Sequence, residues 1–222
     1  MSAPALPQPL ACMFFDLDGT LVDSAPDLHD ALAKLCVERD VAVPEYNIVR
    51  EVTSRGARAV MATAFGPEGQ NAMDALLPRF LDLYTQTGFA NTKPFPGIDA
   101  LLQKLEARGI AWGVITNKIG SLTVPLLERL SYTTRVAALV SGDTLSQRKP
   151  DPAPVLYACA QACIEPAQCA FVGDDPRDVQ AGRAAGVYTI AAAWGYLDGA
   201  DPHDWNPDAI AETATELAGW LA

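Results

Sequence analysis

The sequence predicts an α/β fold: a doubly wound, Rossmann-like parallel sheet with a group of helices inserted after its first strand. Amphipathic stretches alternate with short apolar runs, a pattern typical of a parallel sheet covered by helices on both faces. The alternation stops between residues 24 and 91, where helical patterns follow one another without a convincing strand. The predicted strands are Ala11–Phe15, Ala111–Thr116, Ala137–Ser141, Cys169–Gly173 and Val187–Ala193.

The interrupted stretch predicts a separate helical unit. Its three helical patterns are Pro26–Arg39, Glu45–Phe65 and Glu68–Gln86. The proline-rich segment Thr92–Gly97 is typical of a hinge back into the alternating part. We therefore predict a core domain of residues 1–22 and 92–222 and a helical cap domain of residues 23–91. The cap is expected to lie over the carboxyl ends of the strands, where open α/β sheets bind ligands.

Helix ends in the core are also readable. Pro96 and Gly97 precede a helical pattern over Ile98–Arg108, and Gly109 is expected to end that helix. Pro176 suits the first turn of another helix, and Gly186 its end.

Composition limits the function classes. Half of the 222 residues are hydrophobic, which is enough for a sizeable core. The 27 acidic and 16 basic residues give a net charge of −11, which argues against nonspecific nucleic-acid binding. An anionic small molecule remains a possible substrate, because a bound cation and one lysine can invert the local field.

The remaining composition favours a cytoplasmic location. The five cysteines form no Cys-x-x-Cys pair, which favours free thiols in a reducing compartment. No apolar run approaches a membrane span, and Met1–Gln8 lacks the features of a signal peptide. We expect no membrane or nucleic-acid partner, and the sequence does not indicate an oligomeric state.

The strongest local signal is the segment Asp16-Leu17-Asp18-Gly19-Thr20, directly after the first apolar run. Two aspartates two residues apart point the same way if the strand continues. One carboxylate can then attack an electrophile while the other moves a proton, and a divalent ion can bind both. The alternative is an acidic turn after a strand.

Three further strand ends carry polar residues suited to the same pocket. Each signal has an ordinary structural alternative, namely a turn or cap, a solvated lysine, and an acidic helix N-terminus. Together they are more specific, because each falls at a predicted strand end. The residues are Thr116 and Asn117, then Lys149, then Asp174, Asp175 and Asp178.

With these motifs in this order, the chain resembles the haloacid dehalogenase superfamily, in its phosphatase branch with a helical cap. The resemblance implies that Asp16 is a nucleophile that becomes a transient aspartyl-phosphate and that Asp18 is the acid/base. It implies that Thr116 and Asn117 hold the transferring phosphoryl group and that Lys149 neutralises the reacting oxygens.

The resemblance also implies a metal site for Mg²⁺. Asp174 would bind the ion together with the Asp16 carboxylate and the Asp18 backbone carbonyl. Asp178 would support the metal or the neighbouring lysine from behind, and the role of Asp175 stays open. Oxygen ligands alone favour this hard cation over zinc.

Substrate choice is expected to come from the cap, where Gly56 lies within a helical pattern and is flanked by Arg55 and Arg58. An arginine there can grip a substrate carboxylate, although both arginines can also be ordinary solvated helix residues. The chain resembles phosphoglycolate phosphatases and also N-acetylmuramic acid 6-phosphate phosphatases. Both substrates join a phosphate monoester to a carboxylate, so the sequence leaves the choice open.

Other functions are disfavoured. Asp18 argues against a dehalogenase, whose pattern lacks an acid/base aspartate there, and Thr20 argues against a sugar-phosphate mutase. A binding module without activity would not need a nucleophile and an acid/base. Five other residues lie outside the predicted site: His29, His203, Trp194, Tyr196 and Trp205.

Overall fold

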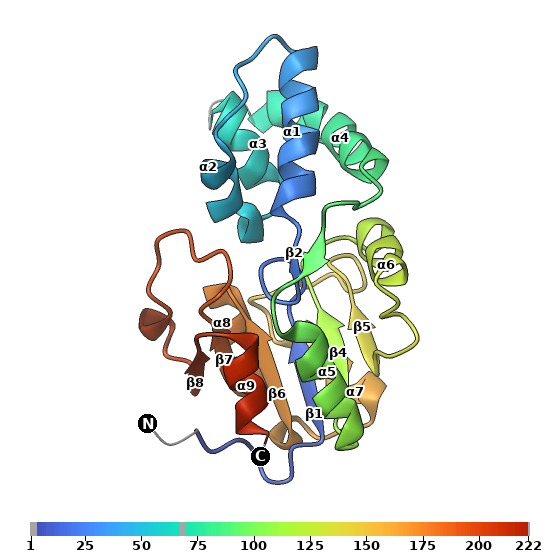
Figure 1. Ribbon diagram of the computed structural model, residues 1–222, viewed down its shortest axis with the longest axis vertical. Coiled ribbons are helices and arrows are strands. Elements are labelled where there is room, and N and C mark those ends of the chain that lie inside the picture. The colour runs from blue at the N-terminus through green and yellow to red at the C-terminus, as the bar shows by residue number, and fades with distance from the viewer. Residues whose placement is uncertain (1–3, 67–69, 222) are drawn as a thin grey trace.

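The computed structural model describes residues 4–66 and 70–221, and their side chains apart from those of residues 70–72. Within these residues, six parallel strands form the central sheet (Figure 1). The order is β5-β4-β1-β6-β7-β8. The chain therefore crosses from one half of the sheet to the other beside β1, where such sheets bind ligands. The strands are β1 (Cys12–Phe15), β4 (Ala111–Ile115), β5 (Ala138–Val140), β6 (Cys169–Gly173), β7 (Tyr188–Ala192) and β8 (Ala209–Ala211).

Alternating side chains of the strands face two different apolar layers. Phe15 and Val172 pack in a cluster with leucines of α5, α6 and α9, whereas Phe14 and Phe171 pack with α7 and α8. The predicted doubly wound α/β core is confirmed. The core helices are α5 (Ile98–Ala107), α6 (Gly120–Arg129), α7 (Ala153–Ala162), α8 (Pro176–Ala185) and α9 (Ala214–Trp220), with short 3-10 turns η2 (Pro166–Gln168) and η3 (Pro202–Trp205).

The five predicted strands lie where the apolar runs placed them, within two residues at each end. The expected helix ends are also correct, since Gly109 and Gly186 take left-handed backbone angles, with φ of 69° and 77°. The edge strand β8 was not predicted, because its three residues form no run long enough to stand out.

The inserted helices, which we define as α1–α4 with η1, lie together at one end of the molecule (Figure 1). The chain enters and leaves them through two short antiparallel strands, β2 (Val22–Asp23) and β3 (Lys93–Pro94). The inserted elements are α1 (Ala25–Glu38), α2 (Tyr46–Glu51), η1 (Thr53–Arg55), α3 (Ala57–Phe65) and α4 (Gln70–Gln86).

The prediction of one continuous helix over Glu45–Phe65 is wrong. The pattern Glu45–Phe65 is split into α2, η1 and α3, because Gly56 has φ 86° and ψ 179° and ends the helical path. The apolar period continues across the break, which is why the sequence pattern looked unbroken. The predicted start of the next helix at Glu68 lies outside the described residues.

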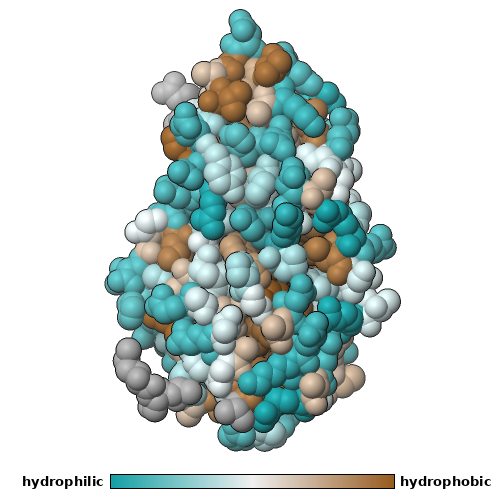
Figure 2. All heavy atoms as spheres, in the orientation of Figure 1, coloured by the Kyte–Doolittle hydropathy of each residue, from teal (hydrophilic) through white to brown (hydrophobic). Residues whose placement is uncertain are grey.

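Figure 2 shows a narrow part formed by the inserted helices on a broader α/β part. Apolar side chains gather near the far tip of the narrow part, where Val37 and Val43 are exposed. Within residues 4–66 and 70–221, every helix lacks the combination of length and apolarity needed to cross a bilayer.

A buried carboxylate ties the two ends of the insertion together. Asp27, in the first turn of α1, accepts hydrogen bonds from the Thr92 amide at 2.6 Å and the Thr92 hydroxyl at 2.7 Å. It also accepts from the Asn91 amide at 3.1 Å. The chain that leaves the inserted helices is thereby fixed to the chain that enters them.

We predict that Asp27→Ala lowers the free energy of unfolding by about 2–4 kcal/mol, because buried donors of Thr92 lose their acceptor. Urea unfolding followed by circular dichroism measures this change. The matched control is Lys34→Ala on the exposed face of the same helix, expected to change stability by less than about 0.5 kcal/mol. Equal effects of the two variants would contradict the assignment.

Candidate active site

A cavity of about 420 Å³ lies between the carboxyl edge of the sheet and the inserted helices. The core contributes Asp16, Thr116 and Lys149 to its wall, and the inserted helices contribute Ser54 and Tyr84. The predicted residues Asp18, Asn117, Asp175, Asp178, Arg55, Gly56 and Arg58 also line it. Segments far apart in the sequence therefore meet at the carboxyl edge of the sheet, where the sequence predicted the site.

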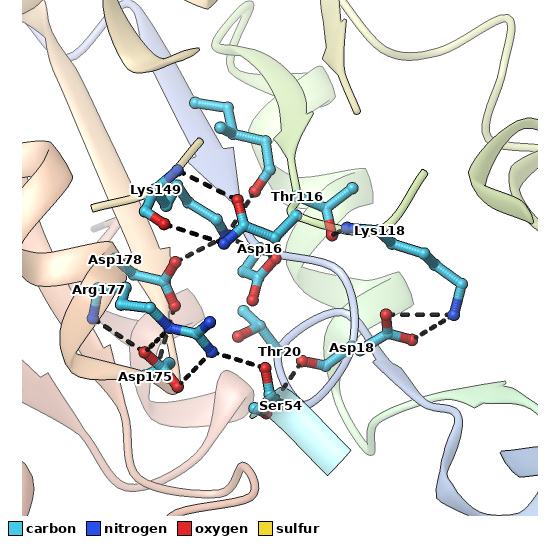
Figure 3. A network of polar contacts seen from close by, with 12 residues as sticks. Asp16, Asp18, Thr20, Ser54, Thr116, Lys118, Lys149, Asp175, Arg177 and Asp178 are labelled. Atoms are coloured by element: carbon cyan, nitrogen blue, oxygen red, sulfur yellow. Dashed lines mark hydrogen bonds and ion pairs between the residues drawn. The ribbon is translucent and has the colours of Figure 1, made fainter. Parts of the chain in front are cut away.

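Lys149 is the central cation of this site. Its ammonium lies 2.8 Å from Asp16 Oδ1 and 2.7 Å from Asp178 Oδ1, and it donates to the Ile115 carbonyl at 2.9 Å. Burial alone lowers the pKa of this lysine, but the two carboxylates outweigh burial and the net pKa is raised. Lys149 is therefore held charged between two acidic groups (Figure 3).

Asn117 fixes the backbone of that lysine. The Asn117 amide nitrogen donates to the Lys149 carbonyl at 3.0 Å, and its oxygen accepts from the Lys149 amide at 3.1 Å. This positioning contact was not predicted. Thr116 ends at the cavity wall, and its hydroxyl accepts from the Lys118 amide at 3.1 Å.

The acidic triad, which we define as Asp16, Asp174 and Asp178, has oxygens that all lie within 4.8 Å of one another. Burial raises the pKa of Asp174 to about 7, and the nearby Asp16 charge adds to the effect. Burial likewise raises the pKa of Asp178, although Lys149 opposes this. Three buried carboxylates face one ammonium, so an additional divalent cation with a preference for oxygen ligands fits this charge.

Asp174 is held from three directions. Its oxygens accept from the Thr20 hydroxyl at 2.8 Å, the Ser54 hydroxyl at 2.6 Å and the Tyr196 amide at 2.9 Å. The Ser54 hydroxyl also lies 3.4 Å from the Asp18 carbonyl oxygen. The Asp18 carbonyl and the Asp174 carboxylate therefore share Ser54 as a neighbour.

Asp18 points into the cavity beside a lysine that was not predicted. Lys118 Nζ lies 2.9 Å and 3.2 Å from the two Asp18 oxygens and donates to the Tyr84 hydroxyl at 2.9 Å. The Ser24 hydroxyl also donates to Asp18. Burial lowers the pKa of Lys118, but the adjacent Asp18 carboxylate outweighs it and the pKa is raised.

Asp175 is not part of the acidic triad. It caps the N-terminus of α8, and its oxygens accept from the Arg177 guanidinium at 2.7 Å and 2.8 Å. Burial opposes this ionisation, but Arg177 prevails and the pKa of Asp175 is lowered. Arg177 in turn donates to the Ser54 carbonyl at 2.7 Å, which links the core to η1 (Figure 3).

The two predicted arginines of the inserted helices lie at the exposed rim of the cavity. Arg55 pairs with Asp198, and Arg58 pairs with Asp74. Their side chains are 61% and 51% exposed, so solvent screens both pairs. Gly56 lies between them, and its backbone lines the cavity.

Two aromatic residues left outside the predicted site, Trp194 and Tyr196, contact residues next to it. Trp194 Nε1 donates to the Thr20 carbonyl at 3.0 Å, and the Tyr196 hydroxyl contacts both Asp23 and the Ala25 amide. The signal for this support was a tryptophan and a tyrosine that flank Gly195 after a strand, a pattern that fits the rim of a pocket as well as core packing. These contacts join the acidic triad to the base of the inserted helices.

Comparison with known proteins places this geometry in a family. Residues 13–192 match the family model of haloacid dehalogenase-like hydrolases. The chain is 41% identical over 212 residues to a phosphoglycolate phosphatase of Xanthomonas campestris pv. campestris (strain 8004), covering 94% of this chain and 96% of the relative. It is 39% identical over 214 residues to an N-acetylmuramic acid 6-phosphate phosphatase of Pseudomonas aeruginosa, covering 94% and 93%.

A solved structure agrees with these relatives. A protein from Haemophilus somnus 129pt, described as a predicted phosphoglycolate phosphatase, superposes with a TM-score of 0.86 at 25% identity. The match covers 96% of this chain and 99% of that one.

The chain belongs to the haloacid dehalogenase-like hydrolases, as the resemblance in its motifs implied. The family and the two named phosphatases together make it a phosphoric monoester hydrolase.

We predict that Gly195→Ala lowers kcat/KM on p-nitrophenyl phosphate by about 100-fold, as small displacements in an active site do. A Cβ at this position would lie 2.2 Å from the Asp174 Cβ and must push that side chain away. Steady-state kinetics at saturating Mg²⁺ measure the loss.

The control is Gly219→Ala, where a Cβ meets open space; its activity is expected to equal that of the unmodified enzyme. A folded Gly195→Ala protein with full activity would show that the placement of Asp174 is unimportant.

Proposed function

We propose that this protein is a Mg²⁺-dependent phosphatase that hydrolyses a small phosphorylated carboxylate through an aspartyl-phosphate, with 2-phosphoglycolate as its substrate. The observation that carries the proposal is the Lys149 ammonium fixed between Asp16 and Asp178 at the floor of a cavity that the inserted helices cover. An anionic phosphate can approach a carboxylate only where such positive charge offsets the repulsion.

In the first step, an Asp16 carboxylate oxygen attacks phosphorus while the bond between phosphorus and the ester oxygen breaks. Asp18 gives its proton to the departing oxygen, so the product leaves as an alcohol. Thr116 and Lys149 hold the phosphoryl oxygens during the transfer. The products of this step are the alcohol and an acyl phosphate on Asp16.

In the second step, Asp18 takes a proton from a water molecule as that water attacks phosphorus. The bond between phosphorus and the Asp16 oxygen breaks, which releases inorganic phosphate and restores the carboxylate. Asp18 is again protonated and ready to serve the next ester.

The metal ligands in this proposal are the Asp16 carboxylate, the Asp18 carbonyl and Asp174. Mg²⁺ bound there would neutralise charge that develops on the phosphoryl oxygens. Asp178 keeps Lys149 in place, and Asp175 anchors Arg177 rather than the ion. Ser54 contacts Asp174 from η1, so the metal site is completed from the inserted helices.

We propose that the inserted helices act as the cap, with residues 23–91 as its extent and hinges at Asp23–Ser24 and Thr92–Pro96. Tyr84 and Ser54 reach the cavity from this side, whereas Asp16 and Lys149 belong to the core. A cap that opens and closes would admit the ester and control water during hydrolysis of the intermediate.

Two features support a small substrate. The cavity volume of about 420 Å³ is at the lower end of the range for ligand sites. A relative with 41% identity is named phosphoglycolate phosphatase. The second candidate is N-acetylmuramic acid 6-phosphate, which the name of the Pseudomonas aeruginosa relative favours at 39% identity.

We predict that Asp16→Asn lowers turnover of 2-phosphoglycolate by at least about 1,000-fold, because an amide is a very weak nucleophile. Removal of Mg²⁺ with EDTA is expected to abolish activity, and added Mg²⁺ to restore it. Asp174→Asn should raise the Mg²⁺ concentration needed for half-maximal activity. Phosphate release measures all three effects.

The matched control is Asp204→Asn on the exposed turn η3, expected to retain normal activity and metal dependence. Hydrolysis by Asp16→Asn at the normal rate would remove the nucleophile from the proposal.

We predict a preference for 2-phosphoglycolate over N-acetylmuramic acid 6-phosphate of about 100-fold or more in kcat/KM, since a site that closes on a small acid excludes a sugar. The two esters are compared side by side at saturating Mg²⁺. The reverse preference would replace the first substrate by the second and leave the phosphatase chemistry in place.

A further inference from the structure

The carboxylate of such a substrate needs its own cation in the cavity wall, because Lys149 is committed to the phosphate end. The rim arginines are poor candidates in this arrangement. Arg55 is already paired with Asp198 and Arg58 with Asp74, and more than half of each arginine side chain is exposed. Exposed charges bind weakly, because solvent and salt screen them.

Lys118 is placed differently. Only 7% of its side chain is exposed, and the residue lines the cavity. Its ammonium contacts Asp18 and the Tyr84 hydroxyl and lies 4.6 Å from the centre of the Tyr84 ring. An ammonium has three donors. The two contacts with Asp18, at 2.9 Å and 3.2 Å, can share one donor and Tyr84 takes a second, which leaves the third for a ligand oxygen.

The position of Lys118 matches one class of carboxylate. Asp18 must touch the ester oxygen that leaves, and Lys118 touches Asp18. In 2-phosphoglycolate a single methylene carbon separates that ester oxygen from the carboxylate. The carboxylate therefore reaches a cation that is in contact with the acid/base residue. In N-acetylmuramic acid 6-phosphate the carboxylate is on an ether substituent at another position of the sugar ring.

We propose that Lys118 is the specificity-determining residue that binds the carboxylate of a short 2-phosphooxy acid, and that Tyr84 positions its ammonium. This assignment rests on the proposed phosphatase function and deepens it. It moves the recognition of the carboxylate from the cap arginines to a buried lysine that directly follows Thr116 and Asn117.

Tyr84 gives the inserted helices a part in this recognition. It is fully buried on α4, and both its hydroxyl and its ring face Lys118 (the lysine reaches toward Asp18 in Figure 3). Tyr84 and Lys118 are 34 residues apart in the sequence. Only the packing of α4 against the core brings the two side chains together. The Lys118 ammonium therefore keeps its contact with Tyr84 only while the inserted helices cover the cavity.

The test compares two esters that differ in one group. 2-Phosphoglycolate carries a carboxylate where 2-hydroxyethyl phosphate carries a hydroxymethyl group. The ratio of their kcat/KM values measures carboxylate recognition, and any general effect on Asp18 cancels in it. We expect the unmodified enzyme to prefer the acid by about 100-fold and Lys118→Met to lower this ratio to within about threefold of one, as loss of a buried charge partner does.

Arg55→Met and Arg58→Met are expected to leave the ratio at its original value. Lys34→Met, on the exposed face of α1 far from the cavity residues, is the control for the loss of a surface lysine and should leave rates unchanged. If Lys118→Met does not fold, the same ratio of kcat/KM values is measured with Lys118→Gln. Circular dichroism and thermal melting establish the folded state of each variant.

Tyr84→Phe separates positioning from general stability. It keeps the ring and removes the hydroxyl, so KM for 2-phosphoglycolate is expected to rise about five- to tenfold with little change in kcat. KM for 2-hydroxyethyl phosphate should stay the same. Equal changes for both esters would overturn the positioning role.

The outcomes distinguish this inference from the function on which it rests. If the unmodified enzyme hydrolyses neither ester, the proposed function is wrong and this inference with it. If both are hydrolysed and Lys118→Met leaves the ratio unchanged, only the assignment of Lys118 is overturned. A ratio that collapses in Arg55→Met or Arg58→Met would overturn the assignment of Lys118 and give the carboxylate to that arginine. The same holds for Arg148→Met, because Arg148 also lines the cavity.

Discussion

The contact on which the rest of the site depends is a single buried ammonium between two carboxylates. Lys149 lies within 2.8 Å of Asp16 and 2.7 Å of Asp178, which would otherwise repel each other in a medium of low dielectric. The Ile115 carbonyl at the end of β4 accepts from the same ammonium, and Asn117 fixes its backbone. Because β5, β4, β1 and β6 are consecutive in the sheet, the segments that follow these four strands deliver the groups to one point.

The inserted helices complete this centre through polar contacts. Ser54 donates to Asp174, Arg177 donates back to the Ser54 carbonyl, and Tyr84 accepts from Lys118. Each of these bonds joins a core element to an inserted one at the wall of the cavity. The acidic triad, Asp18 and the inserted helices therefore share one hydrogen-bond network, so a change in the position of the helices must also change the surroundings of Asp174 and Lys118.

The core residues could be predicted because parallel strands end at the same edge of a sheet. Polar residues after four apolar runs thus had to converge, and Asp16, Thr116, Lys149 and Asp178 do line one cavity. The contributions of Ser54 and Tyr84 could not be predicted, because each comes from a helical pattern whose period shows which face is buried and not what that face meets. The turn at Gly56 was missed for a related reason, since the apolar period runs on through the break. Lys118 had a signal, a charged residue in the same strand-end run as Thr116, but its burial depends on the packing of α4.

The most direct test of the central claim is to trap the covalent intermediate on Asp16. The enzyme is mixed with excess 2-phosphoglycolate and Mg²⁺, quenched in the steady state, treated with borohydride to reduce an acyl phosphate to the alcohol, digested and analysed by mass spectrometry. The account predicts homoserine in place of aspartate at position 16 and at no other aspartate. Steady phosphate release with an unreduced Asp16, or reduction at another carboxylate, would contradict it.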